Sequence, residues 1–218
     1  MKHKSNKEDA LLAFFYNARD YFEKNKKVVY GVITGIVVII AITVIYFSRK
    51  NVSIETAAIE LSKVQGVYDA GNYQAAINGD SLNTYKGLLY IVTEHGSTPS
   101  GELATILLAN SYYFNRDFAN AEKYYKEYSG SNVILKAAAL AGIAAVYEAN
   151  NNHIEAAKQF EKAATYNKDI AVNDEYLYYA IRNYSQAKDN ESVQRLIKVL
   201  KSDYPKSEYI QQVEKFNS

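Results

Sequence analysis

The feature that most constrains this chain is an uncharged run of twenty residues, VVYGVITGIVVIIAITVIYF, at positions 28–47. At a helical rise of about 1.5 Å per residue, twenty residues match a hydrocarbon core of roughly 30 Å. Buried helices of soluble proteins rarely run this far without a charge. A cleaved signal peptide has a shorter apolar region of about 7 to 15 residues that ends in small side chains, whereas this run ends in Tyr46 and Phe47. We therefore predict a transmembrane helix over 28–47 that acts as an uncleaved anchor.

The charges beside this run predict its orientation. Lys24, Lys26 and Lys27 lie directly before it, and only Arg49 and Lys50 lie directly after it. Further basic residues of the tail are Lys2, Lys4, Lys7 and Arg19. Because positive charge is retained on the cytoplasmic side, residues 1–27 are expected to form a basic cytoplasmic tail. The remainder of the chain is then translocated, which in a bacterial inner membrane places it in the periplasm.

The tail also contains an amphipathic pattern over residues 9–24. Its apolar residues recur at spacings of three and four, which puts them on one face of a helix. They are Leu11, Leu12, Phe14, Phe15, Ala18, Tyr21 and Phe22. One interpretation is an interfacial helix that lies on the inner leaflet or docks a membrane partner. The other is a simple extension of the anchor, and the sequence leaves both open.

Composition excludes several classes of protein. Residues 51–218 hold sixteen Lys and Arg against twenty Asp and Glu, so a nucleic-acid surface is not expected. The chain has no Cys, which excludes disulfides, thiolate chemistry and Cys-ligated metals but does not fix the compartment. With only two Pro and ten Gly, long helices are favoured, and we predict an all-α fold.

Residues 51–218 contain a repeat built from small and aromatic side chains. If Ala76, Ala121, Ala156 and Val193 mark one structural position, the steps between copies are 45, 35 and 37 residues. A period near 34 residues is typical of stacked helical hairpins, in which small residues let two helices approach and aromatic rings fill the space beside them. The clearest copy contains Leu140, Ile143, Ala144, Tyr147, Ala156, Phe160 and Ala163. The other copies contain Val64, Val67, Gly71, Tyr73 and Ala76; Leu108, Ala109, Tyr112, Phe118, Ala121 and Tyr125; and Ala180, Ile181, Tyr184, Val193, Ile197 and Pro205.

Polar clusters mark the predicted turn inside each hairpin. They are Gly71-Asn72, Asn115-Arg116-Asp117, Asn150-Asn151-Asn152 and Lys188-Asp189-Asn190. Asn and Asp also cap the helices that follow such turns. The longer first step contains residues 79–101, where we expect an extra short helix over 85–94 and a turn over 95–101.

On these residues the region 48–218 resembles the tetratricopeptide repeat family, which implies a helical-hairpin solenoid of about four pairs behind a single transmembrane helix. The stretches Asn78-Gly79-Asp80, Lys86-Gly87-Leu88, Glu94-His95-Gly96 and Gly101-Glu102-Leu103-Ala104 resemble membrane-anchored repeat proteins of Bacteroidota. Their layout is similar to that of YfgM-like ancillary subunits of the SecYEG translocon. The resemblance implies a protein-binding scaffold whose partners are translocon subunits or periplasmic chaperones. The ending DYPKSEY at 203–209 also resembles envelope repeat proteins of the CpoB and outer-membrane-assembly type, so a coordinator of cell-wall synthesis or outer-membrane assembly is the alternative.

In solenoids of this family the first helix of each pair lines the concave face, and the repeat register then selects a partner groove. Its predicted residues are Gln65, Tyr68, Asn110, Tyr113, Glu148, Glu175, Tyr178 and Arg182. We expect the Tyr rings to anchor a peptide or a segment of a neighbouring protein. An ordinary solvated face is the alternative.

Signatures of catalysis are missing from the sequence. His3, His95 and His153 are isolated and have no metal-ligand spacing, and Gly96–Gly101 lacks the residues of a phosphate loop. There is no nucleophile elbow, and the pair Asp174-Glu175 fits the start of a helix. We therefore expect no enzyme, no cofactor, no metal site and no small-molecule substrate.

Overall fold

The computed structural model describes residues 2–82 and 84–216, with side chains from residue 9 onward. Side chains that the sequence assigned to the basic tail, those of Lys2, Lys4 and Lys7, lie outside this described part, as does that of His3. Within it the chain forms eleven α-helices and a terminal 3₁₀ turn, η1 (Glu214–Phe216). The described residues form no strand, only an isolated bridge between Gly79 and Lys86. The predicted all-α class is confirmed.

The chain divides into two compact units, Met1–Val52 and Ser53–Ser218. The first contains α1 (Lys2–Lys24) and most of α2 (Lys26–Asp69). The apolar run 28–47 lies within α2 and is almost entirely exposed. By length and composition, this helix is long and apolar enough to cross a membrane. No break separates the run from the helix of the first predicted repeat, because α2 continues to Asp69 and buries Ala57, Leu61 and Val64 at its far end.

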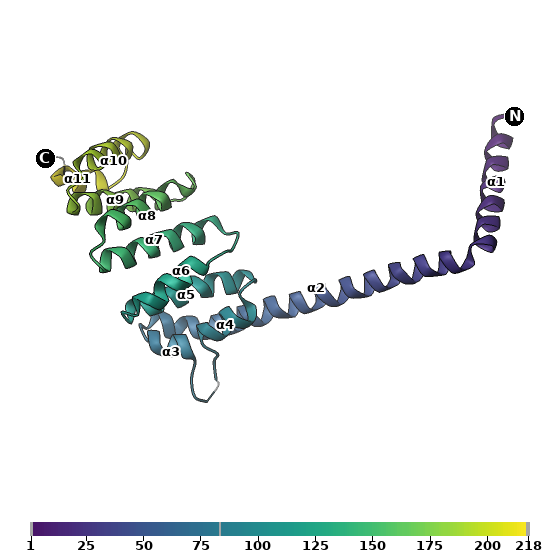
Figure 1. The fold of residues 1–218 in the computed structure, drawn as a ribbon, viewed down its shortest axis with the longest axis horizontal. Helices are drawn as coiled ribbons and strands as arrows, with labels where there is room; N and C mark the ends of the chain where they lie inside the picture. Colours follow the sequence, from purple (N-terminus) through teal and green to yellow (C-terminus); the bar gives the residue numbers. More distant parts are fainter. Residues whose placement is uncertain (1, 83, 217–218) are drawn as a thin grey trace. The chain divides into compact units, whose positions relative to one another are not determined.

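The second unit consists of helices packed in adjacent pairs. The last part of α2 shares a buried cluster with α3 (Tyr73–Asn78). α5 (Pro99–Phe114) pairs with α6 (Phe118–Glu127), α7 (Val133–Ala149) with α8 (His153–Tyr166), and α9 (Asn173–Gln186) with α10 (Asn190–Asp203). Figure 1 shows α5 to α10 following one another in chain order, and α6 contacts α7 just as α8 contacts α9. The short α11 (Tyr209–Val213) packs on α9 and α10 at the end of this row.

The four hairpins share one turn geometry. Gly71, Arg116, Asn151 and Lys188 have positive φ angles of 77°, 61°, 59° and 60°. In each turn the residue after this position donates its N–H to a carbonyl five residues back, as Asp117 does to Tyr112 at 2.9 Å and Asn152 to Tyr147 at 2.8 Å. This is a Schellman C-cap whose last residue is also the N-cap of the next helix. The positions recur at the 45-, 35- and 37-residue steps of the sequence repeat, so the predicted turns are confirmed.

Small residues lie where the helices meet. Ala121, Ala144, Ala156 and Ala163 are completely buried, and Phe160, Ile181 and Val193 lie in the same interior. All of these positions belong to the predicted repeat copies. Tyr184 is also buried as predicted, whereas Tyr112 and Tyr147 are only half-buried. Tyr112 stacks on Tyr124 of α6 with ring centroids 5.5 Å apart, so its ring covers the edge of the core.

The long first step contains the expected extra helix, α4 (Leu88–His95), but with different limits. Between α3 and α4, Asp80 accepts hydrogen bonds from the Thr84 N–H at 2.7 Å and the Tyr85 N–H at 3.3 Å. The predicted turn over 95–101 is too long, because α5 already begins at Pro99. Thr98 caps α5 by accepting from the Gly101 N–H at 3.0 Å, and a proline at the first helical position loses no hydrogen bond.

Candidate binding face

Two of the eight predicted groove residues, Tyr68 and Asn110, are joined directly. The Asn110 side chain on α5 donates to the Tyr68 hydroxyl on α2 at 3.2 Å. Asn110 also accepts from the hydroxyl of Tyr125 on α6 at 2.5 Å. Burial raises the pKa of Tyr68 and, more strongly, that of Tyr125, so both hydroxyls stay protonated. Because both polar atoms of Asn110 are engaged, this residue holds three helices together.

A second group brings Tyr113, Glu148 and Arg182 together from α5, α7 and α9. The Arg182 guanidinium contacts the Glu148 carboxylate at 2.6 Å, and both side chains retain about a third or less of their exposure. Burial raises the pKa of the Tyr113 hydroxyl, the charge of Glu148 raises it further, and Arg182 opposes the shift. The ion pair therefore joins the first helices α7 and α9, and the Tyr113 hydroxyl on α5 lies within the electrostatic influence of both charges.

The group continues to the C-terminal helix. Arg182 lies over the ring of Tyr179 at 4.8 Å and near that of Tyr178 at 6.0 Å. Tyr178 stacks on Tyr209 of α11 with centroids 5.0 Å apart. Glu175 joins through Tyr179, whose hydroxyl donates to its carboxylate at 3.1 Å. We use the name first-helix face for the eight predicted residues together with Tyr179 and Tyr209.

Gln65 stands apart from both groups. It lies exposed on α2, one turn before Tyr68, and no hydrogen bond links it to another residue of the face within the described part. Sequence reasoning missed Tyr179 and Tyr209. Tyr179 directly follows Tyr178, and the repeat register assigned only Tyr178 to the face. Tyr209 lies beyond the last repeat, where the register assigns no position.

An aromatic cavity of about 390 Å³ opens beside Tyr113. It is lined by Tyr113, Phe114, Arg116, Phe118 and Ala149. Phe114 is 52% exposed and stacks on Tyr73 at 4.6 Å, and Tyr113 contacts Phe118 at 5.5 Å. The left-handed turn at Arg116 places a cation at the edge of these rings. The cavity therefore offers ring faces for an apolar side chain and a guanidinium for an anionic group.

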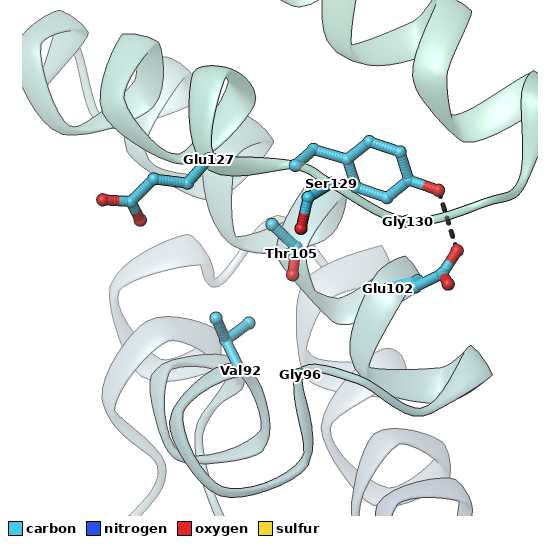
Figure 2. A pocket seen from close by; sticks show the side chains of 8 residues that line it. Val92, Gly96, Glu102, Thr105, Glu127, Ser129 and Gly130 are labelled. Carbon is cyan, nitrogen blue, oxygen red and sulfur yellow. Dashed lines mark hydrogen bonds between the residues drawn. The ribbon is translucent and has the colours of Figure 1, made fainter.

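A smaller cavity of about 200 Å³ lies between α4, the start of α5 and the connection from α6 to α7, as Figure 2 shows. Its carboxylate, Glu102, accepts from the Tyr128 hydroxyl at 2.8 Å and from the N–H groups of Ser131 and Asn132 at 3.3 and 3.4 Å. Burial and the Glu102 charge raise the pKa of Tyr128. The Glu102 carboxylate thus stabilises the connection between α6 and α7. Glu127, the other carboxylate of the lining, points away from Glu102 in Figure 2.

Two histidines also have local partners. His95 shares a hydrogen bond of 2.8 Å with Ser53, and His153 shares one of 2.9 Å with Asn183. Among the described residues no three His, Cys, Asp or Glu side chains come close enough to hold a metal ion. The first-helix face consists instead of aromatic rings and a paired charge at helix contacts.

Comparison with models of known protein families finds no match for this sequence, and comparison with curated proteins finds none either. The functional argument therefore depends on the helices, on the apolar segment of α2 and on the first-helix face.

Proposed function

We propose that this chain is a membrane-anchored scaffold of the tetratricopeptide type that binds a segment of a partner protein, and that it is not an enzyme. The observation that carries the proposal is the first-helix face. Side chains of successive first helices contact one another on it, and they leave partly exposed Tyr rings and an open aromatic cavity beside them. Tyr and Arg in such settings dominate the binding energy of protein interfaces.

The repeat geometry supports the family assignment. Four hairpins with one turn geometry, at the steps of the sequence repeat, are what a stack of homologous helix pairs requires. Each pair alone leaves an apolar side uncovered, and stacking buries it, as the continuous burial of alanines in α5 to α9 illustrates. A stack of this kind offers a long surface rather than an enclosed reaction centre.

Anchoring supports a role beside a membrane complex. The apolar part of α2 would span the bilayer, and the Lys residues before it favour a cytoplasmic N-terminus with the repeat region in the periplasm of a bacterial inner membrane. Restricting the scaffold to the membrane raises its effective concentration near membrane partners, so moderate affinity is sufficient. The sequence resemblance makes translocon subunits and periplasmic chaperones the leading partners, with cell-envelope assembly factors as the alternative.

The aromatic cavity indicates what the bound segment carries. Rings of Tyr113, Phe114 and Phe118 suit an aromatic or aliphatic side chain, and Arg116 at the edge of the cavity suits a neighbouring carboxylate. The bound segment is therefore expected to combine an apolar anchor with an acidic group.

Affinity purification of the full chain from native membranes in mild detergent tests this proposal. In the double variant Tyr113→Ala/Tyr178→Ala, recovery of the bound partner should fall by about tenfold or more, because loss of two anchor rings costs several kcal/mol at typical interfaces. Tyr166→Ala is the matched control, since Tyr166 is 46% exposed on α8, a second helix of its pair. Unchanged recovery with an intact helical spectrum would refute the groove. Recovered translocon subunits support the leading partner, and wall or outer-membrane factors support the alternative.

A further inference from the structure

The helix before the apolar segment has an uncovered apolar face. At about 100° per residue, Leu11, Phe15, Ala18 and Phe22 of α1 fall within one narrow sector. Leu11 and Phe15 are 57% and 64% exposed, and Phe14 and Tyr21 extend the same face. Phe14, Phe15 and Tyr21 are each more than half exposed within their own unit, and a face of such rings is costly to leave in water.

The opposite side of α1 is polar. Asn17, Asp20 and Lys24 lie there, and Lys24 pairs with Asp20 at 2.7 Å. Ala13 falls among them, about 140° from Ala18 at about 100° per residue. Leu12 and Tyr16 also fall outside the apolar sector, so the polar side is mixed, but the largest cluster of apolar side chains lies on one side of the helix, as in helices of a membrane interface.

A single residue, Asn25, separates this helix from α2, whose apolar run begins at Val28. α1 ends at Lys24, α2 begins at Lys26, and the carbonyl of Asn25 accepts from both Val28 and Val29 at 2.9 and 3.0 Å. The Asn25 side chain donates to the Tyr21 carbonyl at 3.0 Å. Across the junction Phe22 contacts Tyr30 edge to face at 5.7 Å. The apolar face of α1 is thereby held beside the first turn of the apolar segment.

We propose that α1 lies on the surface of the bilayer, with Leu11, Phe15, Ala18 and Phe22 in the boundary between lipid headgroups and acyl chains. This inference rests on the proposed membrane anchoring. Lipid is the occupant that the structure favours over protein, because only residues 25–27 lie between α1 and the apolar run, which keeps the end of α1 at headgroup level. Lys27 at this junction also suits anionic headgroups, whereas Lys26 pairs with Glu23 at 2.8 Å.

The chain has no Cys, so single cysteines can report on each face of α1. The full chain would be reconstituted into vesicles of phosphatidylethanolamine and phosphatidylglycerol, carrying a polarity-sensitive fluorophore on Ala18→Cys or on the matched variant Ala13→Cys. We expect a blue-shifted emission at position 18, with quenching by lipid-borne quenchers. At position 13 we expect water-like emission and quenching by a soluble quencher.

A third variant, Ile39→Cys, separates this inference from the anchoring on which it depends. Lipid quenching at position 39 together with water-like emission at both 13 and 18 would overturn the interfacial helix and leave the anchor intact. Absence of lipid quenching at position 39 would instead overturn the anchor. If position 18 is water-exposed in vesicles but shielded in native membranes, its occupant is a protein and the lipid proposal is wrong.

Discussion

Gly142 and Gly66 provide a pair of substitutions whose effects should have opposite signs. Both glycines lie inside helices, in α7 and α2, where Ala is intrinsically better than Gly by about 1 kcal/mol. At Gly66 an added Cβ meets nothing within 4 Å. At Gly142 it overlaps Cε1 and Cζ of Tyr125 and comes within 2.7 Å of Cδ1. Helix propensity alone therefore predicts that Ala stabilises the fold at both sites. Packing allows this at Gly66 and opposes it at Gly142.

The Tyr125 ring has little freedom to withdraw. It is only 4% exposed, and its hydroxyl donates to Asn110 at 2.5 Å. Overpacking of a core costs about 1–3 kcal/mol, and separating a buried hydrogen-bonded pair costs about 1–3 kcal/mol. After subtracting the propensity gain, we expect Gly142→Ala to lower the free energy of unfolding by about 2 kcal/mol. Gly66→Ala should raise it by about 1 kcal/mol.

Urea denaturation of the full chain in detergent, followed by far-ultraviolet circular dichroism, measures both values. A double-mutant cycle with Tyr125→Leu isolates the clash, since Gly142→Ala should no longer destabilise once the ring is gone. If Gly142→Ala stabilises as much as Gly66→Ala, or if its cost persists beside Tyr125→Leu, the close contact of α6 with α7 is not as described.

Two further predictions concern the turns and the ties between hairpins. Lys188 has a left-handed conformation, so Lys188→Gly should raise the free energy of unfolding by about 1 kcal/mol. Lys198→Gly inside α10 is the control and should lower the free energy of unfolding by about 1 kcal/mol. Changes of the same sign in urea denaturation would contradict the turn geometry. The two hydrogen bonds from Arg195 at 2.7 and 3.0 Å hold the pKa of Glu161 below its usual range, so this carboxylate stabilises the fold at neutral pH and ceases to do so as the pH falls below about 4.3 and through the lowered value. Glu161→Gln should therefore cost about 1 kcal/mol at neutral pH and nothing once the wild-type carboxylate is protonated, and a cost independent of pH would refute the ion pair.

Local sequence signals were sufficient for much of this fold. The apolar run follows from its length without a charge, the four turns from clusters of Gly, Asn and Asp, and the buried alanines from small residues at the positions of the repeat. The start of α5 was missed, although Thr98-Pro99 is a recognisable helix start, because the Gly-rich stretch around it indicated a longer turn.

The contacts of the candidate site could not be predicted from local sequence signals. The register put Asn110 on the right face, but its engagement by Tyr68 and Tyr125 joins residues 42 and 15 positions away. Only the folded chain determines which partner such a side chain finds. The stacking of Tyr209 on Tyr178 depends on where α11 packs after the last repeat, and no periodic signal specifies that position.

Site-specific photocrosslinking in intact native cells tests the proposed scaffold most directly. A photoreactive phenylalanine derivative would replace Tyr113, beside the aromatic cavity, or Tyr166, exposed on α8. The account predicts a discrete crosslinked partner at position 113, found in the membrane fraction and absent at position 166. Equal crosslinking at the two positions, or none at position 113 while position 166 captures a partner, would contradict binding through the first-helix face.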